Sequence, residues 1–407
     1  MAMWLIVRRQ LRRPLMPLLV IFQVALACAI TCNALFLLNQ QLMPILASDG
    51  ISDPGRLVFL HNIAARGDPW PAVRMRGLKA DLSAVPGVRQ VSYAATLPMI
   101  SSAQWAQDVR TAESNVKVSA TVYFGDNLIN SLGLQLTGGR DFTPEEEATT
   151  LDINIMGSHK YEAVIITEAL AARLFPNGRA VGNLLPDSNS QIVGVVAHLI
   201  RNNPTKDSRA LEYAILVPGI VQQWAVPMFA VRLASSDTDQ TCKNMLLVLK
   251  QDVGSELLPG DQIGCDSYAT LRNQELAAPL AAVWLLSGVT LVVLIVTITG
   301  ILGMTGYWVQ QRTRSIGVCR ALGARRSDVI REVLIENAVV VGMGAIVGLV
   351  AAYGINLWLM RHYELSHLPL SYFPVGALLL LVLGQLAALA PAHRASNIQP
   401  IVATRAI

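Results

Sequence analysis

The composition of this 407-residue chain is that of a membrane protein. Hydrophobic residues make up 53% of it and charged residues 15%, and its mean hydropathy is +0.44, which is too apolar for an ordinary soluble enzyme. The formal net charge of +4 is too small and too dispersed to indicate a nucleic-acid-binding protein. Because the charges are unevenly spread, their positions carry more information than their sum.

Four windows contain no Asp, Glu, Lys or Arg and are long enough to cross roughly 30 Å of hydrocarbon at about 1.5 Å per residue. They span residues 14–48, 276–311, 337–360 and 365–393. We therefore expect a membrane protein with four transmembrane α-helices and a large extracytoplasmic mixed α/β domain inserted between helices 1 and 2.

The first window could instead be a cleaved signal peptide, because ALAC, ending at Cys28, resembles a poor lipoprotein cleavage box. However, the apolar run is too long for the hydrophobic region of a signal peptide. It also continues past Cys28 through AITCNALFLL, where a mature lipoprotein would turn polar. An uncleaved membrane anchor is the favoured interpretation.

Arginines in the short connecting segments set the expected orientation, because basic residues resist translocation. They precede the first window, lie between the second and third, and follow the fourth: Arg8, Arg9, Arg12, Arg13, Arg312, Arg314, Arg320, Arg325, Arg326, Arg331, Arg394 and Arg405. The link RHYELSHLP between the last two windows carries one Arg against one Glu, as an external hairpin should. Both termini are therefore expected in the cytoplasm.

The expected division of the chain follows from these windows. It comprises the N-terminus with helix 1 (1–47), the external α/β domain (48–275), helix 2 (276–311), a cytoplasmic loop (312–331), helix 3 (332–360), a short external loop (361–369), helix 4 (370–391) and a cytoplasmic tail (392–407).

The external segment has the pattern of one mixed α/β domain or of two closely joined ones. Strand-like runs are RLVFLH, VKVSATVYF, EAVIITE, QIVGVVAHLI and FAVRLA. Helix-like stretches between them are PAVRMRGLKADLSAV, TEALAARLF and TDQTCKNMLLVLKQDV. Thr238 is placed to cap the last of these helices, and Gly254 follows its end.

Motifs of catalytic chemistry are missing from the sequence. It has no G-x-x-x-x-G-K-[ST] loop for phosphate, no H-E-x-x-H metal motif and no G-x-S-x-G nucleophile turn. His362 and His367 share a short loop with Glu364, but an isolated pair there is more typical of a membrane interface than of a metal site. We expect neither an enzyme nor a bound metal.

The five cysteines divide by expected compartment. Cys28 and Cys32 are one helical turn apart in the first window, where they are expected only to pack, and Cys319 should stay reduced in the cytoplasm. Cys242 and Cys265 are the two in the external domain, in a predicted helix and in the strand DQIGCDSY that follows it. Either a disulfide that closes this helix–strand unit or two buried free thiols would fit.

The stretch RTRSIGVCRALGARR follows the second window and is strongly basic. Its spacing suits a short interfacial helix with Ile316, Cys319 and either Ala321 or Leu322 on one side, with Arg312, Arg314 and Arg320 elsewhere, and with Gly323 as its C-terminal cap. Composition alone allows two interpretations. The loop either anchors topology on anionic headgroups or docks a cytoplasmic protein.

The third window carries GAIVG, in which Gly344 and Gly348 permit close contact between helices. Packing within the chain is favoured over a dimer face. The first window contains Gln23 and Asn33, whose amides are expected to find partners on adjacent helices.

Ordered motifs along nearly the whole chain resemble the FtsX-like permease family, and specifically its MacB branch. RTRSIGVCRALGARRSDVIREVLIENAVVVGMGAIVGLV is similar to a coupling helix of the form E-R-T-R-E-I-G-x-R-R-A-L-G-A followed by a glycine-rich third helix, and PAHRASNIQPIVATRA is similar to the closing segment of that family. VPGVRQVS, YFGDNLINSLGLQLTGGRDF, AVIITEALAARLFPNGRAVGN and QIVGVVAHLIR resemble, in order, its periplasmic core domain.

The resemblance implies that residues 312–325 form a coupling helix that docks on a nucleotide-binding subunit. The implied coupling residues are Arg312, Arg314, Ser315, Ile316, Gly317, Arg320, Ala321, Leu322, Gly323 and Arg325. Gln311 and Ser315 stand where the family usually has acids, so any ion pairs that those acids make with the ATPase are absent here.

The function that the resemblance implies is that of a permease subunit in the bacterial inner membrane. It would act in dimers as a mechanotransmitter, coupling ATP hydrolysis by a separate ABC ATPase to export of peptides, antibiotics or other envelope molecules. The implied partners are that ATPase, a second permease copy or paralogue, and a periplasmic adaptor with an outer-membrane channel. ATP and Mg would act through the ATPase rather than bind this chain.

Two alternatives remain at this point. A lipoprotein-release or cell-division type of FtsX-like protein would instead extract lipoproteins or activate a cell-wall hydrolase. A membrane receptor or scaffold would bind a ligand with its external domain and use the basic loop only for topology.

Overall fold

The structure, a computed structural model, describes residues 15–101, 104–110, 117–152, 161–204, 210–235, 237–258, 262–363 and 372–397. The chain divides into two compact units. The α/β unit spans Leu42–Leu280, and the helical unit comprises Met1–Gln41 together with Ala281–Ile407. The predicted basic residues at 8, 9, 12, 13 and 405, and residues 364–369 of the predicted external loop (361–369), lie outside the described residues.

A ten-stranded mixed sheet organises the α/β unit, with the strand order β12-β1-β11-β2-β4-β9-β7-β8-β5 and β3 paired to β4. The pairs β4–β9 and β7–β8 are parallel, and the other pairs in this sheet are antiparallel. The strands are β1 (Leu57–His61), β2 (Val88–Ala94), β3 (Ala106–Arg110), β4 (Lys117–Gly125), β5 (Leu136–Gly139), β7 (Ala163–Thr167), β8 (Gln191–Val196), β9 (Ala214–Pro218), β11 (Met228–Leu233) and β12 (Gly264–Ser267). Two short strands, β6 (Thr150–Leu151) and β10 (Ile220–Val221), form a separate parallel pair.

Six strands of the sheet are buried on both faces along nearly their whole length: β1, β4, β7, β8, β9 and β11. Successive side chains of a strand point to opposite faces, and in β1 Val58 and Leu60 join one apolar cluster whereas Leu57 and Phe59 join another. A strand covered on both sides needs apolar residues at every position. This explains why the strands read in the sequence as continuous apolar runs.

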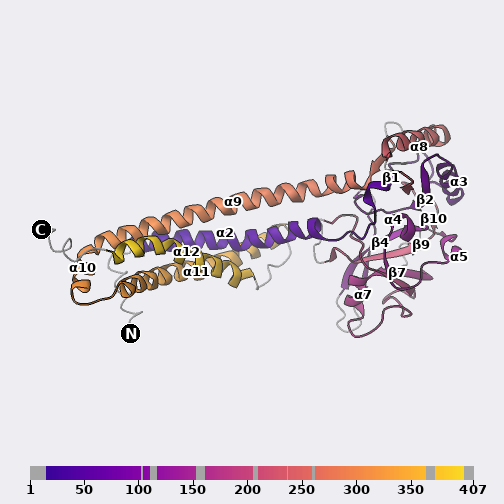
Figure 1. The fold of residues 1–407 in the computed structure, drawn as a ribbon. Coiled ribbons are helices and arrows are strands. Elements are labelled where there is room, and N and C mark those ends of the chain that lie inside the picture. The colour runs from indigo at the N-terminus through magenta and orange to yellow at the C-terminus, as the bar shows by residue number, and fades with distance from the viewer. Residues whose placement is uncertain are drawn as a thin grey trace. The chain divides into compact units, whose positions relative to one another are not determined.

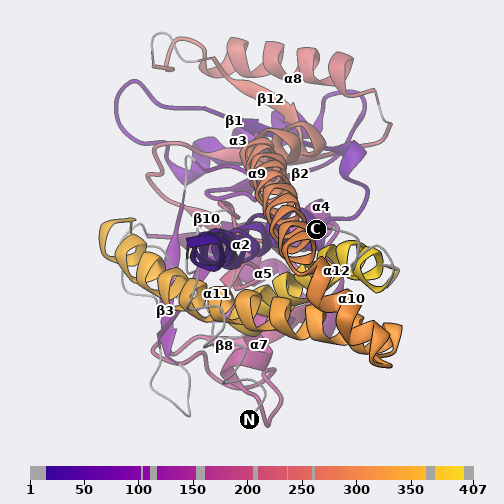
Figure 2. The same cartoon turned by 90° about the vertical axis from the view of Figure 1, so that its left-hand side faces the viewer.

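Helices cover both faces of the sheet. One apolar cluster contains side chains of α3 (Ala72–Ser83), α7 (Glu168–Leu174) and α8 (Thr238–Val253), and the other contains side chains of α4 (Leu128–Leu132) and of the first turn of α9 (Tyr268–Gln311). A single turn, α5 (Pro144–Glu147), and the 3-10 helix η1 (Pro54–Arg56) complete the unit. Figure 2 shows α8 lying beside β12 and β1 at one edge of the sheet.

The predicted cap of α8 was wrong by one residue. Asp237 occupies the N-cap position, and Thr238 is already the first helical residue. A capping side chain must sit on a non-helical residue that precedes the helix, so Thr238 does not cap. Met245, Leu249 and Val253 recur every four residues on the buried side of α8, which is the pattern that predicts the helix from sequence.

Within the described residues, four helices are long and apolar enough to cross a membrane. They are α2 (Leu15–Leu46), α9 (Tyr268–Gln311), α11 (Arg326–Tyr363) and α12 (Tyr372–Ser396). The 44 residues of α9 span about 66 Å at about 1.5 Å per residue, roughly twice the thickness of a hydrocarbon core. The helix begins at Tyr268, before its charge-free window. The window starts only at residue 276 because the first turns of the helix carry Arg272 and Glu275.

In the helical unit, α11 packs closely on α2. A Cβ at Gly344 would lie 2.8 Å from Val24 Cβ, and a Cβ at Gly348 would lie 2.5 Å from the carbonyl oxygen of Ala25. Both glycines of GAIVG therefore face a helix of the same chain. The amides of α2 also find backbone partners, since Gln23 donates to the Val296 carbonyl of α9 at 2.8 Å.

Substitution of these glycines provides a test of the α2–α11 contact. Gly348→Ala is expected to destabilise the full chain by about 1–3 kcal/mol, because the added methyl group overlaps α2. Gly354→Ala on the same helix is the control, since a Cβ there meets nothing within 4 Å. Thermal unfolding in detergent measures both variants, and equal midpoints would contradict the close packing.

Candidate functional site

The basic segment after α9 forms a short helix, α10 (Thr313–Ala321). Arg312 is its N-cap and follows the end of α9 directly. At the other end Gly323 adopts φ +103°, its N–H donates to the carbonyl of Arg320, and the N–H of Ala324 donates to that of Cys319. This is a Schellman ending, which requires a residue in the left-handed region and therefore favours glycine.

The chain then reverses tightly into α11. The backbone N–H of Arg325 donates to the Asp328 carboxylate at 2.9 Å. An acidic side chain in the first turn also interacts favourably with the helix N-terminus. Figure 1 shows α10 as the short helix between the ends of α9 and α11.

One face of α10 is turned toward the helices of its own unit. Arg312 Nη1 donates to both carboxylate oxygens of Glu336 at 2.6 Å, and Glu336 on α11 is buried. Arg320 Nη1 donates to the carbonyl of Ser396 near the end of α12 at 2.8 Å. Two residues that lie between these arginines in the sequence are also covered, since Gly317 is buried and Ile316 is half-buried. These contacts hold α10 against α11 and α12.

The opposite face of α10 is open. We name Arg314, Ser315, Val318 and Leu322 the outer face of α10; all four are exposed, with Leu322 83% and Val318 47% exposed. Arg314, Val318 and Leu322 are spaced four residues apart, so they share one side of the helix. An exposed leucine at the tip of a basic helix is a feature of docking surfaces.

This arrangement differs from the grouping expected from sequence, which put Ile316 beside Leu322. The structure instead groups Ile316 with Arg312 and Arg320, because both guanidinium groups find acceptors on α11 and α12. Val318 is the residue of the outer face that the sequence interpretation missed. Its spacing of four residues from Arg314 and from Leu322 is the signal that would have found it.

The remaining implied coupling residues also lie at the surface. Ala321, Gly323 and Arg325 are exposed. Gln311 and Ser315, which stand at positions that are usually acidic in the family, are exposed as well. The surface around the outer face therefore keeps its positive charge, and an acidic rim on a partner would complement it.

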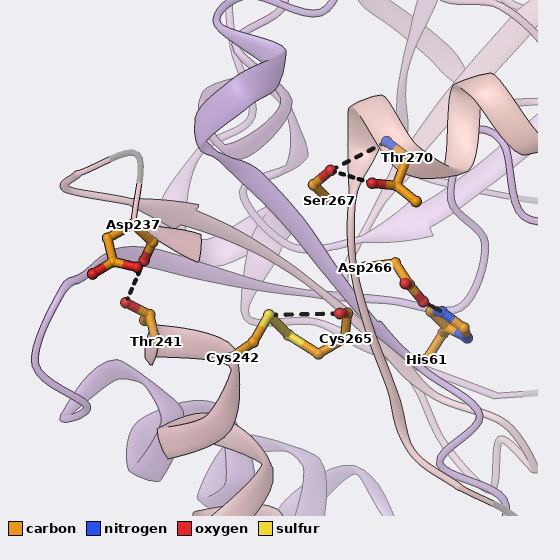
Figure 3. The surroundings of a disulfide bond; sticks show 8 residues. All are labelled: His61, Asp237, Thr241, Cys242, Cys265, Asp266, Ser267 and Thr270. Atoms are coloured by element: carbon orange, nitrogen blue, oxygen red, sulfur yellow. Dashed lines mark hydrogen bonds and ion pairs between the residues drawn. A yellow bond between two sulfur atoms is a disulfide. The ribbon is translucent and has the colours of Figure 1, made fainter. Parts of the chain in front are cut away.

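A second feature lies where the sheet joins α9. Cys242 on α8 and Cys265 on β12 form a disulfide, and β12 pairs with β1 at the edge of the sheet (Figure 3). On the other side of β12, Asp266 contacts His61 of β1 at 2.8 Å. After Ser267 the chain enters α9 without a loop. The disulfide therefore fastens the strand that leads directly into this long helix.

The ends of α2 and α9 in the α/β unit are joined by a polar cluster. Tyr268 donates to the Asp49 carboxylate at 2.8 Å, and Arg272 forms an ion pair with the same carboxylate at 3.2 Å. Arg272 also donates to the carbonyl of Ile45 in the last turn of α2 at 3.3 Å. One carboxylate thus ties the residues that follow α2 to the first two turns of α9.

Metal-ligating side chains do not gather in the part of the chain that the structure describes. It contains no group of three His, Cys, Asp or Glu that could hold a metal ion. Cys28 and Cys32 are buried and Cys319 is exposed on α10, each as a free thiol. Cys319 is therefore a native chemical label for this helix.

Two family models match this chain. Residues 287–400 match the FtsX-like permease C-terminal model, and residues 34–246, about half of the chain, match the MacB-like periplasmic core domain model. The chain belongs to the FtsX-like, MacB-type permease family. The first model covers most of α9 together with α10, α11 and α12, and the second covers the end of α2 and the strands from β1 to β11.

Relatives of known name are ABC transporter permeases. The chain is 26% identical to the uncharacterized ABC transporter permease YvrN of Bacillus subtilis over 72% of this chain and 71% of the relative. It is 24% identical to the uncharacterized ABC transporter permease YknZ of the same organism, over 87% of this chain and 86% of that protein. It is also 24% identical to the macrolide export ATP-binding/permease protein MacB of Chromobacterium violaceum, over 83% of this chain and 50% of that protein. The chain thus spans about half the length of the MacB relatives.

A solved structure was also found. The extracellular domain of the noncanonic ABC-type transporter YknZ from Gram-positive bacteria aligns with 51% of this chain and 99% of that domain, at 15% identity and a TM-score of 0.33.

Proposed function

We propose that this chain is the permease subunit of a MacB-like ABC system and acts as a mechanotransmitter. The observation that carries the proposal is the continuity of α9. One helix of 44 residues begins directly after β12 and ends one residue before α10. Movement applied to α10 would therefore reach the sheet through a single helix, whose hydrogen-bond ladder is interrupted at Pro279.

The outer face of α10 is the proposed input. A separate ABC ATPase docks on Leu322 and Val318 and is guided by the surrounding arginines. ATP and Mg bind that ATPase. Closure of two ATPase subunits pushes on α10, and the Arg312–Glu336 ion pair makes α11 move with it.

The α/β unit is the proposed output. It lies outside the inner membrane, and the cytoplasm contains α10 and both chain termini. The disulfide and the Asp49 cluster tie α2 and α9 to the sheet, so movement of the two helices reshapes the unit. Its cargo is peptides, antibiotics or other molecules already in the envelope, which pass to an adaptor and an outer-membrane channel. This cargo does not have to cross the lipid bilayer.

A second permease copy or paralogue is part of the proposal. The apolar window of α2 is 50% buried within the chain, whereas that of α9 is only 11% buried. Large apolar side chains such as Trp284, Leu285 and Val292 are more than half exposed on α9. This surface suits lipid together with the α9 helix of a second permease. MacB-type membership supports export over lipoprotein release.

Labelling of Cys319 tests the orientation on which the coupling depends. A membrane-impermeant maleimide should leave Cys319 unlabelled in spheroplasts and should label it in inverted vesicles, because the thiol is exposed on α10. The variant Cys319→Ser is the control for background labelling. Affinity purification from the same membranes should recover an ABC ATPase. Labelling of Cys319 from the outside would overturn the proposal.

A further inference from the structure

A polar pocket of about 320 Å³ lies in the α/β unit, away from the disulfide and from α9. Its walls come from the segment around η1, from β2, from the end of α4 and from β11. Three arginines, Arg56, Arg89 and Arg232, line it, together with Gln90 and Asp53. Neither the family comparison nor the proposed coupling assigns a role to this pocket.

Arg232 is the most deeply placed of the three arginines and is only 8% exposed. Its Nε donates to the carbonyl of Ser131, and its Nη1 donates to the carbonyls of Ser52 and Asp53. These bonds fix the guanidinium plane. Burial lowers the pKa of Arg232, the nearby Arg89 lowers it further, and Asp53 raises it.

Three donors at the pocket lack an acceptor. Nη2 of Arg232 and Nε2 of Gln90 are both buried without a hydrogen-bond partner. Arg89 is exposed and forms no hydrogen bond or ion pair with any residue that the structure describes. Buried donors are almost always satisfied in folded proteins. Two unsatisfied ones beside a free guanidinium therefore indicate an acceptor that none of the described residues supplies.

The charge of the pocket selects an anion. Among its described lining residues the one acid is Asp53, which forms an ion pair with Arg56 at 3.5 Å and also interacts with Arg232, so one negative charge stands against three positive ones. Guanidinium groups bind phosphate and carboxylate oxygens with strong, directional hydrogen bonds. Three donor groups that line one pocket suit the three terminal oxygens of a phosphoryl group better than the two oxygens of a carboxylate.

We propose that the pocket between η1, β2, α4 and β11 binds a phosphoryl group through Arg89, Gln90 and Arg232. A volume of about 320 Å³ leaves room for a molecule larger than one phosphate ion. This assignment rests on the α/β unit alone. It would stand or fall independently of the docking of an ATPase on α10.

Binding of inorganic phosphate to the full chain in detergent tests the assignment. Phosphate is expected to raise the unfolding temperature saturably above that seen in chloride of equal ionic strength. Arg89→Gln should weaken the binding about tenfold or more, because a charge-assisted bond is lost. Arg173→Gln is the control, since Arg173 is an exposed arginine on α7 outside the pocket.

Further measurements distinguish a soluble phosphate ester from a lipid headgroup. Because Arg89 is exposed, Arg89→Gln should keep the unfolding temperature of the native chain without phosphate. Tighter binding of glycerol phosphate than of inorganic phosphate would indicate a soluble phosphate ester. A shift seen only in nanodiscs that contain phosphatidylglycerol, and lost in Arg89→Gln, would indicate a lipid headgroup. Equal binding by Arg89→Gln and the native chain, or binding of acetate without phosphate, would overturn the proposal.

Discussion

Leu322→Asp is expected to abolish recovery of the ATPase with the tagged chain. Leu322 is 83% exposed at the tip of α10, so the substitution leaves the fold of the permease unchanged. In the complex it would place a carboxylate in the apolar centre of the interface. Loss of an interface anchor costs about 2–4 kcal/mol, which weakens binding by about 30-fold to 1,000-fold.

The matched control is Leu184→Asp. Leu184 is 56% exposed and belongs to the α/β unit, so the same change of side chain is made far along the sequence from α10. This variant should bring down as much ATPase as the native chain. Ile316→Asp is a poorer probe, because Ile316 is half-buried and its replacement would also disturb packing. Undiminished recovery of the ATPase by Leu322→Asp would remove α10 as the docking element.

Removal of the disulfide is expected to have the second large effect. The double variant Cys242→Ala/Cys265→Ala should lose about 3 kcal/mol of stability in the α/β unit, because a cross-link over 23 residues restricts the unfolded chain. For a unit of this size the unfolding temperature should fall by about 6–12 °C. Differential scanning calorimetry of the full chain measures the change.

Hydrogen–deuterium exchange of single strands distinguishes this effect from a general loss of stability. Because β12 pairs with β1 at the sheet edge, its amides should exchange faster in the double variant, while those of β9 in the middle of the sheet should not. A reductant should reproduce the loss in the native chain and should add nothing in the double variant. An unchanged unfolding temperature in both tests would show that the cross-link does not stabilise the α/β unit.

The sequence predicts most of the secondary structure of this protein. Charge-free windows locate the four long apolar helices, because lipid excludes charged side chains. The run TDQTCKNMLLVLKQDV predicts a helix over residues 238–253, and α8 spans Thr238–Val253. Apolar runs of strand length predict β1, β4, β7, β8 and β11, and the run DQIGCDSY predicts β12. The strands β2, β3, β5 and β9 were missed, and β3 and β5 carry too few apolar residues to be found in this way. The expected choice between one external domain and two resolves to one continuous sheet in a single compact unit.

The arrangement of the site was harder to predict, because it depends on partners that are distant in the sequence. Arg312 faces inward only because Glu336 meets it, and Arg320 because the carbonyl of Ser396 meets it. Neither partner is visible from the periodicity of α10 itself. The cluster at Asp49 likewise joins residues more than 200 positions apart in the chain. Spacing predicts which residues share a face but not what that face contacts.

The strand order shows the same limit. β12 lies beside β1 at one edge, although the two strands are separated by nearly the whole α/β unit in sequence. This pairing brings the end of the unit back to its beginning, so that the chain enters the unit from α2 and leaves it through α9 close to the same carboxylate, that of Asp49. Local patterns specify the strands, and non-local packing decides their neighbours.

Hydrogen–deuterium exchange of the complex of this chain with its ATPase tests the coupling most directly. The chain is reconstituted in nanodiscs with the ATPase bound, with and without a non-hydrolysable ATP analogue. If α9 carries the movement, the analogue should change exchange at residues 264–280, where β12 leads into α9. Unchanged exchange at 264–280, with the ATPase bound and its nucleotide sites filled, would contradict the account.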